Sequence, residues 1–98
     1  MAQYIAMRIQ LSSSFHRKIK KENVRIQKSF KEALLLFMLN PFDPQLDNHS
    51  LKNLWKGCRS IVVTADYRAI YEEINEGNIV IAHFITIGTH EELYEKDN

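Results

Sequence analysis

Apolar residues lie on both sides of the segment 78–87, which alternates between two faces in the manner of a strand. A strand that is apolar on both faces is covered above and below, so this pattern predicts the central strand of a sheet. After it, Thr89 and Glu92 have the spacing of a capping box, which predicts a short helix with His90 in its first turn. One face of the strand carries Ile79, Ile81, His83, Ile85 and Ile87, and the other carries Val80, Ala82, Phe84 and Thr86.

The first forty residues predict one strand and two helices. Residues 4–11 alternate an apolar face with a mixed face, which is typical of a strand with one partly covered side. Ser12–Ser14 offers N-cap oxygens before Phe15, so a helix should begin there. From Ile26 onward, apolar residues recur at the three-four spacing of a helical stripe until Pro41 ends the helix.

The apolar stripe of the second helix is wider than one buried face requires. Leu35, Leu36 and Leu39 extend it, and they belong either to a deep core or to a surface kept for a partner protein. The connection that follows, residues 41–56, is long for a compact domain. Long loops on small scaffolds are often functional, so this segment is a candidate for site residues.

The remaining pattern predicts strands throughout. Residues 61–63 and 67–74 are strand-like, and residues 75–78 form a hairpin turn before the central strand. Helices and strands that segregate in this way predict an α+β fold. We expect two N-terminal helices packed on a largely antiparallel four-stranded sheet, in the order strand-helix-helix-strand-strand-strand, with a short C-terminal helix. Residues 1–98 form a single domain.

Charge is unevenly distributed along the chain, although the formal net charge is only +1. Basic residues gather between residues 17 and 31, and acidic residues gather toward the C-terminus. A surface of this kind can hold a polyanion on one side, or it can be an ordinary solvated helix face. The candidate substrate-binding lysines in this basic segment are Lys18, Lys20, Lys21 and Lys28.

The same composition indicates a cytoplasmic protein without a membrane partner. No apolar run approaches the ~20 residues that cross a bilayer. Cys58 is the single cysteine, so it cannot form an internal disulfide.

Candidate catalytic groups occur in three different local elements: His49 in the long loop, Asp66 at a strand turn, and His90 after the central strand. In a meander, the turn before the second strand and the far end of the third lie at the same edge of the sheet, so Asp66 and His90 should be neighbours. Arg59 and Arg68 lie on the adjoining strands, where a phosphate bound between them would meet two cations.

A base, an acid and a cation suit the cleavage of RNA by its own 2′-hydroxyl. That reaction needs no metal and no cofactor, and the scattered histidines lack the spacing of a metal site. Each group also has a plain structural explanation. Asp66 could form a turn, His49 could be a loop residue without a role, and His90 could be a polar residue at a helix start.

Several motifs in the second half of the chain resemble a known family, while the first half agrees in layout. The family is the RelE/ParE superfamily of type II toxin–antitoxin toxins, and especially its YafQ-like branch. The motifs are His-Ser-Leu-Lys at 49–52, Trp-Lys-Gly-Cys-Arg-Ser at 55–60, Asp-Tyr-Arg-Ala-Ile-Tyr at 66–71 and Gly-Thr-His-Glu-Glu-Leu-Tyr at 88–94.

The resemblance implies a bacterial toxin that enters the A site of the small ribosomal subunit and cuts mRNA as an endoribonuclease. It also implies a cognate antitoxin that holds the toxin inactive, in a possible hetero-oligomer. His49, Asp66 and His90 fall on catalytic positions of the YafQ-like branch. Arg68 falls on an arginine that RelE uses, and Tyr94 falls on the aromatic residue that RelE places near the scissile site.

The chain departs from the YafQ-like pattern at Val62, where that branch has a further active-site histidine. Members that act on the ribosome also tend to be more strongly cationic than this chain. Two other functions therefore stay open: a non-enzymatic ParE-like inhibitor of DNA gyrase, and an inactive protein that only binds an antitoxin.

Overall fold

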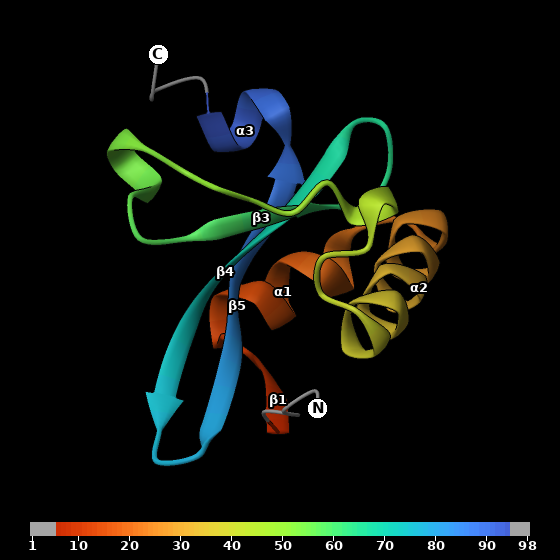
Figure 1. Cartoon of the computed structure of the whole chain (residues 1–98). Helices are drawn as coiled ribbons and strands as arrows, with labels where there is room; N and C mark the ends of the chain where they lie inside the picture. The colour runs from red at the N-terminus through yellow and green to blue at the C-terminus, as the bar shows by residue number, and fades with distance from the viewer. Residues whose placement is uncertain (1–5, 95–98) are drawn as a thin grey trace.

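The sheet and helices of the protein follow one another in nearly the predicted order (Figure 1). The computed structural model describes residues 6–94. The strands are β1 (Ala6–Leu11), β2 (His49–Ser50), β3 (Arg59–Val62), β4 (Tyr67–Glu76) and β5 (Ile79–Thr89). The α-helices are α1 (Ser13–Lys21), α2 (Val24–Leu39) and α3 (His90–Tyr94), and the 3-10 helices are η1 (Pro44–Leu46) and η2 (Asn53–Trp55).

The five strands form one sheet in the order β1-β5-β4-β3-β2. β1 is parallel to β5, and the other neighbouring pairs are antiparallel. The predicted α+β fold is therefore confirmed, with β5 inside the sheet, but the expected number of four strands is wrong. The extra strand is β2, which has only two residues, and a two-residue strand is too short to show an alternating pattern.

Side-chain caps begin the helices where the sequence predicts them. The Ser12 hydroxyl accepts a hydrogen bond from the Phe15 N–H at 2.9 Å. At α3, the Thr89 N–H donates to Glu92 Oε1 at 2.8 Å, and the Glu92 N–H donates to Thr89 Oγ1 at 3.2 Å. These reciprocal bonds are the predicted capping box.

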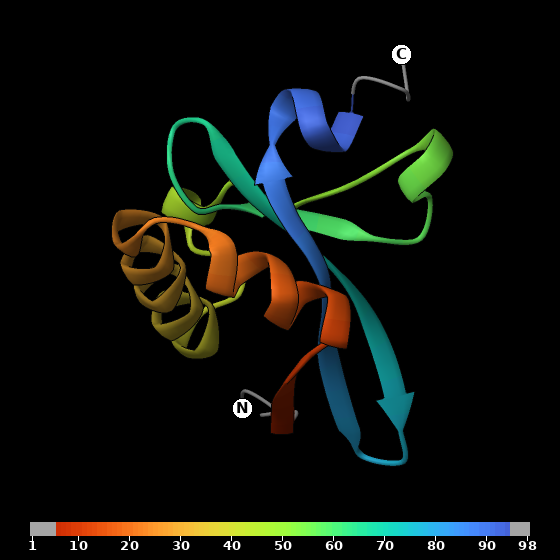
Figure 2. The same ribbon diagram turned by 180° about the vertical axis from the view of Figure 1, so that it is seen from behind.

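An aromatic cluster joins the two long helices to one face of the sheet, which we call the helix face (Figure 2). At its centre is Phe84 of β5, whose side chain is fully buried. Its ring lies 5.1–6.1 Å, centroid to centroid, from four other aromatic rings. Those rings belong to Phe15 of α1, Phe30 and Phe37 of α2, and Tyr71 of β4.

A β-bulge at Ile85 changes the faces that were predicted for β5. Ile70 pairs with Thr86 and Tyr71 pairs with Phe84, so β5 has one residue more than β4 at this point. An extra residue reverses the alternation beyond it. Ile87 therefore joins Phe84 in the core cluster, instead of facing the opposite way as strict alternation predicted.

The wide apolar stripe of α2 is only partly core. Leu36 is half-buried against the core cluster, but Leu35 and Leu39 are 59% and 85% exposed. The deep-core explanation is thus wrong for Leu35 and Leu39, because the sheet covers only one side of the helix. No helix within residues 6–94 is long and apolar enough to cross a membrane.

Replacing Phe84 with alanine should lower the free energy of unfolding by about 3–5 kcal/mol, because it leaves a cavity among four rings. Urea unfolding followed by circular dichroism measures the change. Leu39→Ala is the matched control, and it should change the free energy by less than about 0.5 kcal/mol because that side chain is exposed. Equal effects of the two substitutions would contradict the assignment of Phe84 to the core.

Candidate functional site

The face of the sheet opposite α1 and α2, which we call the open face, carries a different set of side chains. Arg68 of β4 donates from Nε to the hydroxyl of Ser60 on β3 at 2.8 Å, so both side chains lie on this face. Ser60 is fully buried. A Cβ atom added to Gly88 would lie 3.0 Å from Glu92 Oε1 and 3.3 Å from Leu93 Cδ2, so α3 folds over the same face.

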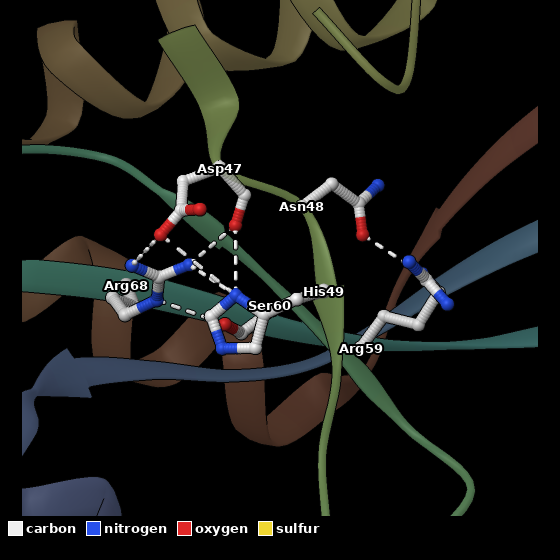
Figure 3. Close-up of polar contacts among 6 residues, drawn as sticks. All are labelled: Asp47, Asn48, His49, Arg59, Ser60 and Arg68. Atoms are coloured by element: carbon white, nitrogen blue, oxygen red, sulfur yellow. Dashed lines mark hydrogen bonds and ion pairs between the residues drawn. The ribbon is translucent and has the colours of Figure 1, made fainter. Parts of the chain in front are cut away.

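A polar cluster forms where the segment after η1 crosses the open face, and we call it the Asp47 cluster (Figure 3). Arg68 Nη2 donates to the Asp47 carbonyl oxygen at 2.8 Å, and Arg68 Nη1 lies 3.4 Å from Asp47 Oδ2. His49 Nδ1 lies 3.0 Å from the same carbonyl oxygen and 3.4 Å from Arg68 Nη2. The structure therefore brings together two of the four predicted catalytic residues, His49 and Arg68, which are 19 positions apart in the sequence.

Local structure fixes the position of Asp47. It ends η1 in a left-handed conformation, with φ 45° and ψ 49°, and its N–H donates to the Pro44 carbonyl oxygen at 3.2 Å. Leu46, the preceding residue, is 2% exposed and packs in the core. The chain is thus anchored on one side of Asp47 by Leu46 and on the other by β2, where His49 pairs with Ser60.

Asp66 and His90 line a second feature, a hollow of about 390 Å³. Tyr67 pairs with Thr89 across β4 and β5, which brings the residues just outside the two strand ends together. The prediction that Asp66 and His90 lie near each other is confirmed. The turn itself is made by the Thr64 hydroxyl, which accepts from the Asp66 N–H at 3.2 Å and the Tyr67 N–H at 3.1 Å, so the turn does not need the Asp66 carboxylate.

The helix α3 holds His90 and Tyr94 against each other, with ring centroids 4.8 Å apart. It is fastened to η2, because the Trp55 indole N–H donates to the Leu93 carbonyl oxygen at 2.8 Å. The Tyr94 hydroxyl oxygen is buried and has no hydrogen-bond partner in the part of the chain that the structure describes.

The four predicted catalytic residues thus form two pairs, His49 with Arg68 and Asp66 with His90. Arg68 pairs with Gly88 across β4 and β5, and His90 follows Gly88 by two residues. The Arg68 backbone therefore connects the Asp47 cluster to the hollow beside His90. Between residues 6 and 94, no hydrogen bond or ion pair joins His49 or Arg68 directly to Asp66 or His90.

The structure does not bring Arg59 together with Arg68, and the predicted phosphate clamp between them is not formed. Arg59 pairs with Tyr71 on the helix face, donates from Nε to Asn48 Oδ1 at 2.8 Å and lies 5.2 Å above the Phe42 ring. Arg68 instead reaches Ser60, the next residue of β3. Neighbouring residues of a strand point to opposite faces, and Figure 3 shows the two guanidinium groups apart.

The predicted substrate-binding lysines also separate. Lys18 of α1 donates from Nζ to Thr86 Oγ1 at 3.0 Å, and Thr86 lies beside Ile70 across β4 and β5. Lys20 and Lys28 line a groove of about 650 Å³ between α1 and α2, whose other lining residues include Leu11, Ile19, Val24 and Phe30. Lys21 is exposed on the last turn of α1. Of the four, only Lys18 makes a side-chain hydrogen bond to a sheet residue within residues 6–94.

Asp47 and Ser60 were not identified from the sequence as members of the site, although both contact Arg68. Asp47 acts through its backbone carbonyl oxygen, which no residue pattern reveals, while Ser60 lies within a motif that was recognised without a role for its hydroxyl. Within residues 6–94, no three or more His, Cys, Asp or Glu side chains are arranged to hold a metal ion.

Comparisons with known proteins show which family model and which solved structures this chain resembles. A family model described as the bacterial toxin of a type II toxin–antitoxin system, YafQ, matches residues 7–95. The crystal structure of YafQ from E. coli strain BL21(DE3) has a TM-score of 0.71 and 26% identity, covering 88% of this chain and 96% of that chain. The E. coli DinJ–YafQ complex gives a TM-score of 0.62 and 25% identity, covering 88% and 96%.

A more distant structure shares the fold alone. The YoeB/ParE toxin from Agrobacterium tumefaciens has a TM-score of 0.69 and 18% identity, covering 86% of this chain and 99% of that chain. Among curated protein sequences, none matches this chain.

Cys58 should not act as a nucleophile at neutral pH. Burial, and then the charge of Glu72, raise the pKa of its thiol, and the thiolate is the reactive form. Iodoacetamide should therefore modify Cys58 more slowly than free cysteine, and the rate should rise only as the pH passes above the ordinary range of a thiol. Glu72→Gln should move that rise to lower pH. A rate equal to that of free cysteine at neutral pH would contradict this prediction.

Proposed function

Because the chain belongs to the YafQ family of bacterial toxins of type II toxin–antitoxin systems, we propose that it is an endoribonuclease that cuts mRNA on the ribosome. The observation that carries the proposal is the contact of His49 with Arg68 on the open face, next to the hollow that Asp66 and His90 line. A cation and two imidazoles near the paired ends of β4 and β5 would provide the groups that the reaction requires.

In this reaction the 2′-hydroxyl of one nucleotide attacks the adjacent phosphorus. One group removes the 2′ proton, and a second group gives a proton to the departing 5′ oxygen. The products are a 2′,3′-cyclic phosphate and a free 5′-hydroxyl. We assign these two proton transfers to His49 and His90, with Asp66 beside His90.

Arg68 is suited to stabilise the charge that develops on the phosphorane. Its side chain is 17% exposed, so the guanidinium is partly shielded from water and still reaches the open face. Charge stabilisation by a fixed donor is strongest where water is excluded. Lys18, which reaches the same sheet from its edge, is the lysine that we propose for contact with the RNA backbone. We also propose that Tyr94, whose ring lies against His90, stacks on a base beside the scissile bond.

The proposal is tested by adding the protein to a translating extract and mapping cleavage within the A-site codon. Wild-type protein should cut the message, and a 2′-deoxy nucleotide at the scissile position should block cutting because the attacking hydroxyl is gone. His90→Ala should reduce the rate by about 10²–10⁴-fold, the usual contribution of a positioned acid or base. His16→Ala is the matched control, because His16 is exposed on α1, and it should leave the rate unchanged.

Intact message at a high dose of folded wild-type protein would refute the nuclease. A supercoiling assay on the same sample then distinguishes the alternatives: inhibition of gyrase would identify a ParE-like poison, and no effect in either assay would identify an inactive antitoxin-binding protein.

We further propose that a cognate antitoxin restrains this toxin, as the E. coli complex of YafQ with DinJ suggests. The groove between α1 and α2 has an apolar floor that includes Leu11 and Phe30, and lysines at its rim that include Lys20, Lys28 and Lys31. An apolar floor suits a packed peptide better than an RNA backbone, and the lysines suit acidic residues on either side of that peptide.

The groove can be tested with the cognate antitoxin. In isothermal titration calorimetry, the double substitution of Lys28 and Lys31 by glutamate should weaken its binding by at least about tenfold, because the rim charges are reversed. Lys56→Glu, an exposed residue beside η2, is the control and should bind as the wild type does. Equal binding of both variants would place the antitoxin elsewhere.

A further inference from the structure

Asp47 contacts two of the proposed catalytic residues, His49 and Arg68, and no pattern in the sequence predicts these contacts. Its carbonyl oxygen lies 2.8 Å from Arg68 Nη2 and 3.0 Å from His49 Nδ1. Its carboxylate lies farther from both, at 3.4 Å from Arg68 Nη1 and 3.8 Å from His49 Nδ1. The two short contacts therefore come from the backbone, and the two long ones come from the side chain.

We propose that the Asp47 carbonyl oxygen fixes the tautomer of His49 and the direction of Arg68, so that His49 Nε2 is the general base of the cleavage. This inference rests on the proposed function. Asp47 is a positioning residue in this reaction, because it acts through His49 and Arg68 and does not itself touch the RNA.

The tautomer follows from what a carbonyl oxygen can do. A carbonyl oxygen only accepts hydrogen bonds, so the 3.0 Å contact requires the hydrogen to be on His49 Nδ1. The guanidinium of Arg68 only donates, and its Nη2 lies 3.4 Å from His49 Nδ1, where a hydrogen bond would need the opposite tautomer. Nη2 is already bound to the same carbonyl oxygen at 2.8 Å, and the 3.0 Å contact of Nδ1 with that oxygen is the shorter of the two that Nδ1 makes, so we assign the hydrogen to Nδ1. In a neutral imidazole the lone pair is then on Nε2. The His49 side chain is 50% exposed, which leaves that nitrogen accessible to a 2′-hydroxyl.

The exposed carboxylate contributes little to this arrangement. The Asp47 side chain is 67% exposed, and ion pairs exposed to solvent are weak because water screens them. The carbonyl oxygen is held by the left-handed backbone of Asp47, which Leu46 anchors in the core. Asp, Asn and Gly tolerate this conformation, whereas β-branched residues resist it. The backbone conformation, and not the charge, should therefore be the property that matters.

The arrangement also leaves Nη1 of Arg68 able to bind a phosphate oxygen. Nε is bound to the buried hydroxyl of Ser60 and Nη2 to the carbonyl oxygen, so the plane of the guanidinium is fixed from two sides. Among the residues that the structure describes, the one hydrogen-bond partner of Nη1 is the exposed carboxylate, at the long distance of 3.4 Å. A phosphate oxygen can replace that contact without turning the group.

The test compares Asp47→Asn and Asp47→Gly with Asp47→Val. Long-range ¹H–¹⁵N spectra of the free protein report which nitrogen of His49 is protonated. Wild type, Asp47→Asn and Asp47→Gly should show the proton on Nδ1, while Asp47→Val should shift it toward Nε2. In the cleavage assay, Asp47→Asn should stay within a few-fold of wild type, and Asp47→Val should lose at least about tenfold in kcat with a smaller change in KM.

Asn53→Val is the matched control for backbone strain. Asn53 has φ 54°, lies in the same connection between α2 and β3, and is not among the residues drawn for the Asp47 cluster in Figure 3. The substitution should destabilise the protein to a similar extent, as thermal unfolding will show, and leave the His49 tautomer unchanged.

The spectra are recorded without RNA, so the inference and the proposed function can fail separately. A proton on Nε2 in the wild type, or an unchanged tautomer in Asp47→Val, would overturn the inference even if the protein cuts RNA. The expected tautomer in a folded protein that cuts no message would refute the nuclease, and with it the role of His49 as base.

Discussion

The open face of the sheet depends on the packing of Phe84 on the other face. Four aromatic rings surround Phe84, and they hold α1 and α2 against the same side of β5 and β4. Because alternate residues of a strand point in opposite directions, fixing one side of the sheet also fixes which side chains face away from the helices. Ser60 and Arg68 face that way, and the polar site is built on them.

At the end of β5 where the site lies, the bulge at Ile85 decides which residues face the helices and which lie on the open face. It reverses the alternation, so that Ile87 enters the core and Gly88 faces α3. Without the extra residue, Ile87 would point toward α3 and Gly88 would leave a gap in the core. The α3 helix could not then fold over Gly88, and His90 would lose the position that brings it to Asp66.

The site combines rigid strands with a connection that is anchored at a few points. Arg68 and Ser60 are on paired strands, whereas Asp47 and His49 belong to the segment between η1 and β2. Leu46 in the core and the pairing of His49 with Ser60 hold that segment in place. A left-handed residue between these anchors turns its carbonyl oxygen toward the open face, 3.0 Å from His49 Nδ1, while the carboxylate of the same residue lies farther away at 3.8 Å.

The sequence by itself determined the elements that local physics controls: the capped helix starts, the apolar central strand, the α+β class, and the nearness of Asp66 to His90 across a meander. Only the tertiary structure decided the rest. The two-residue strand β2, the reversed face of Ile87 and the divergence of Arg59 from Arg68 all depend on register, which strand pairing sets and residue type does not. The contacts of the Asp47 carbonyl oxygen could not be predicted for a simpler reason, since every residue carries such an oxygen and only the folded chain decides where it points.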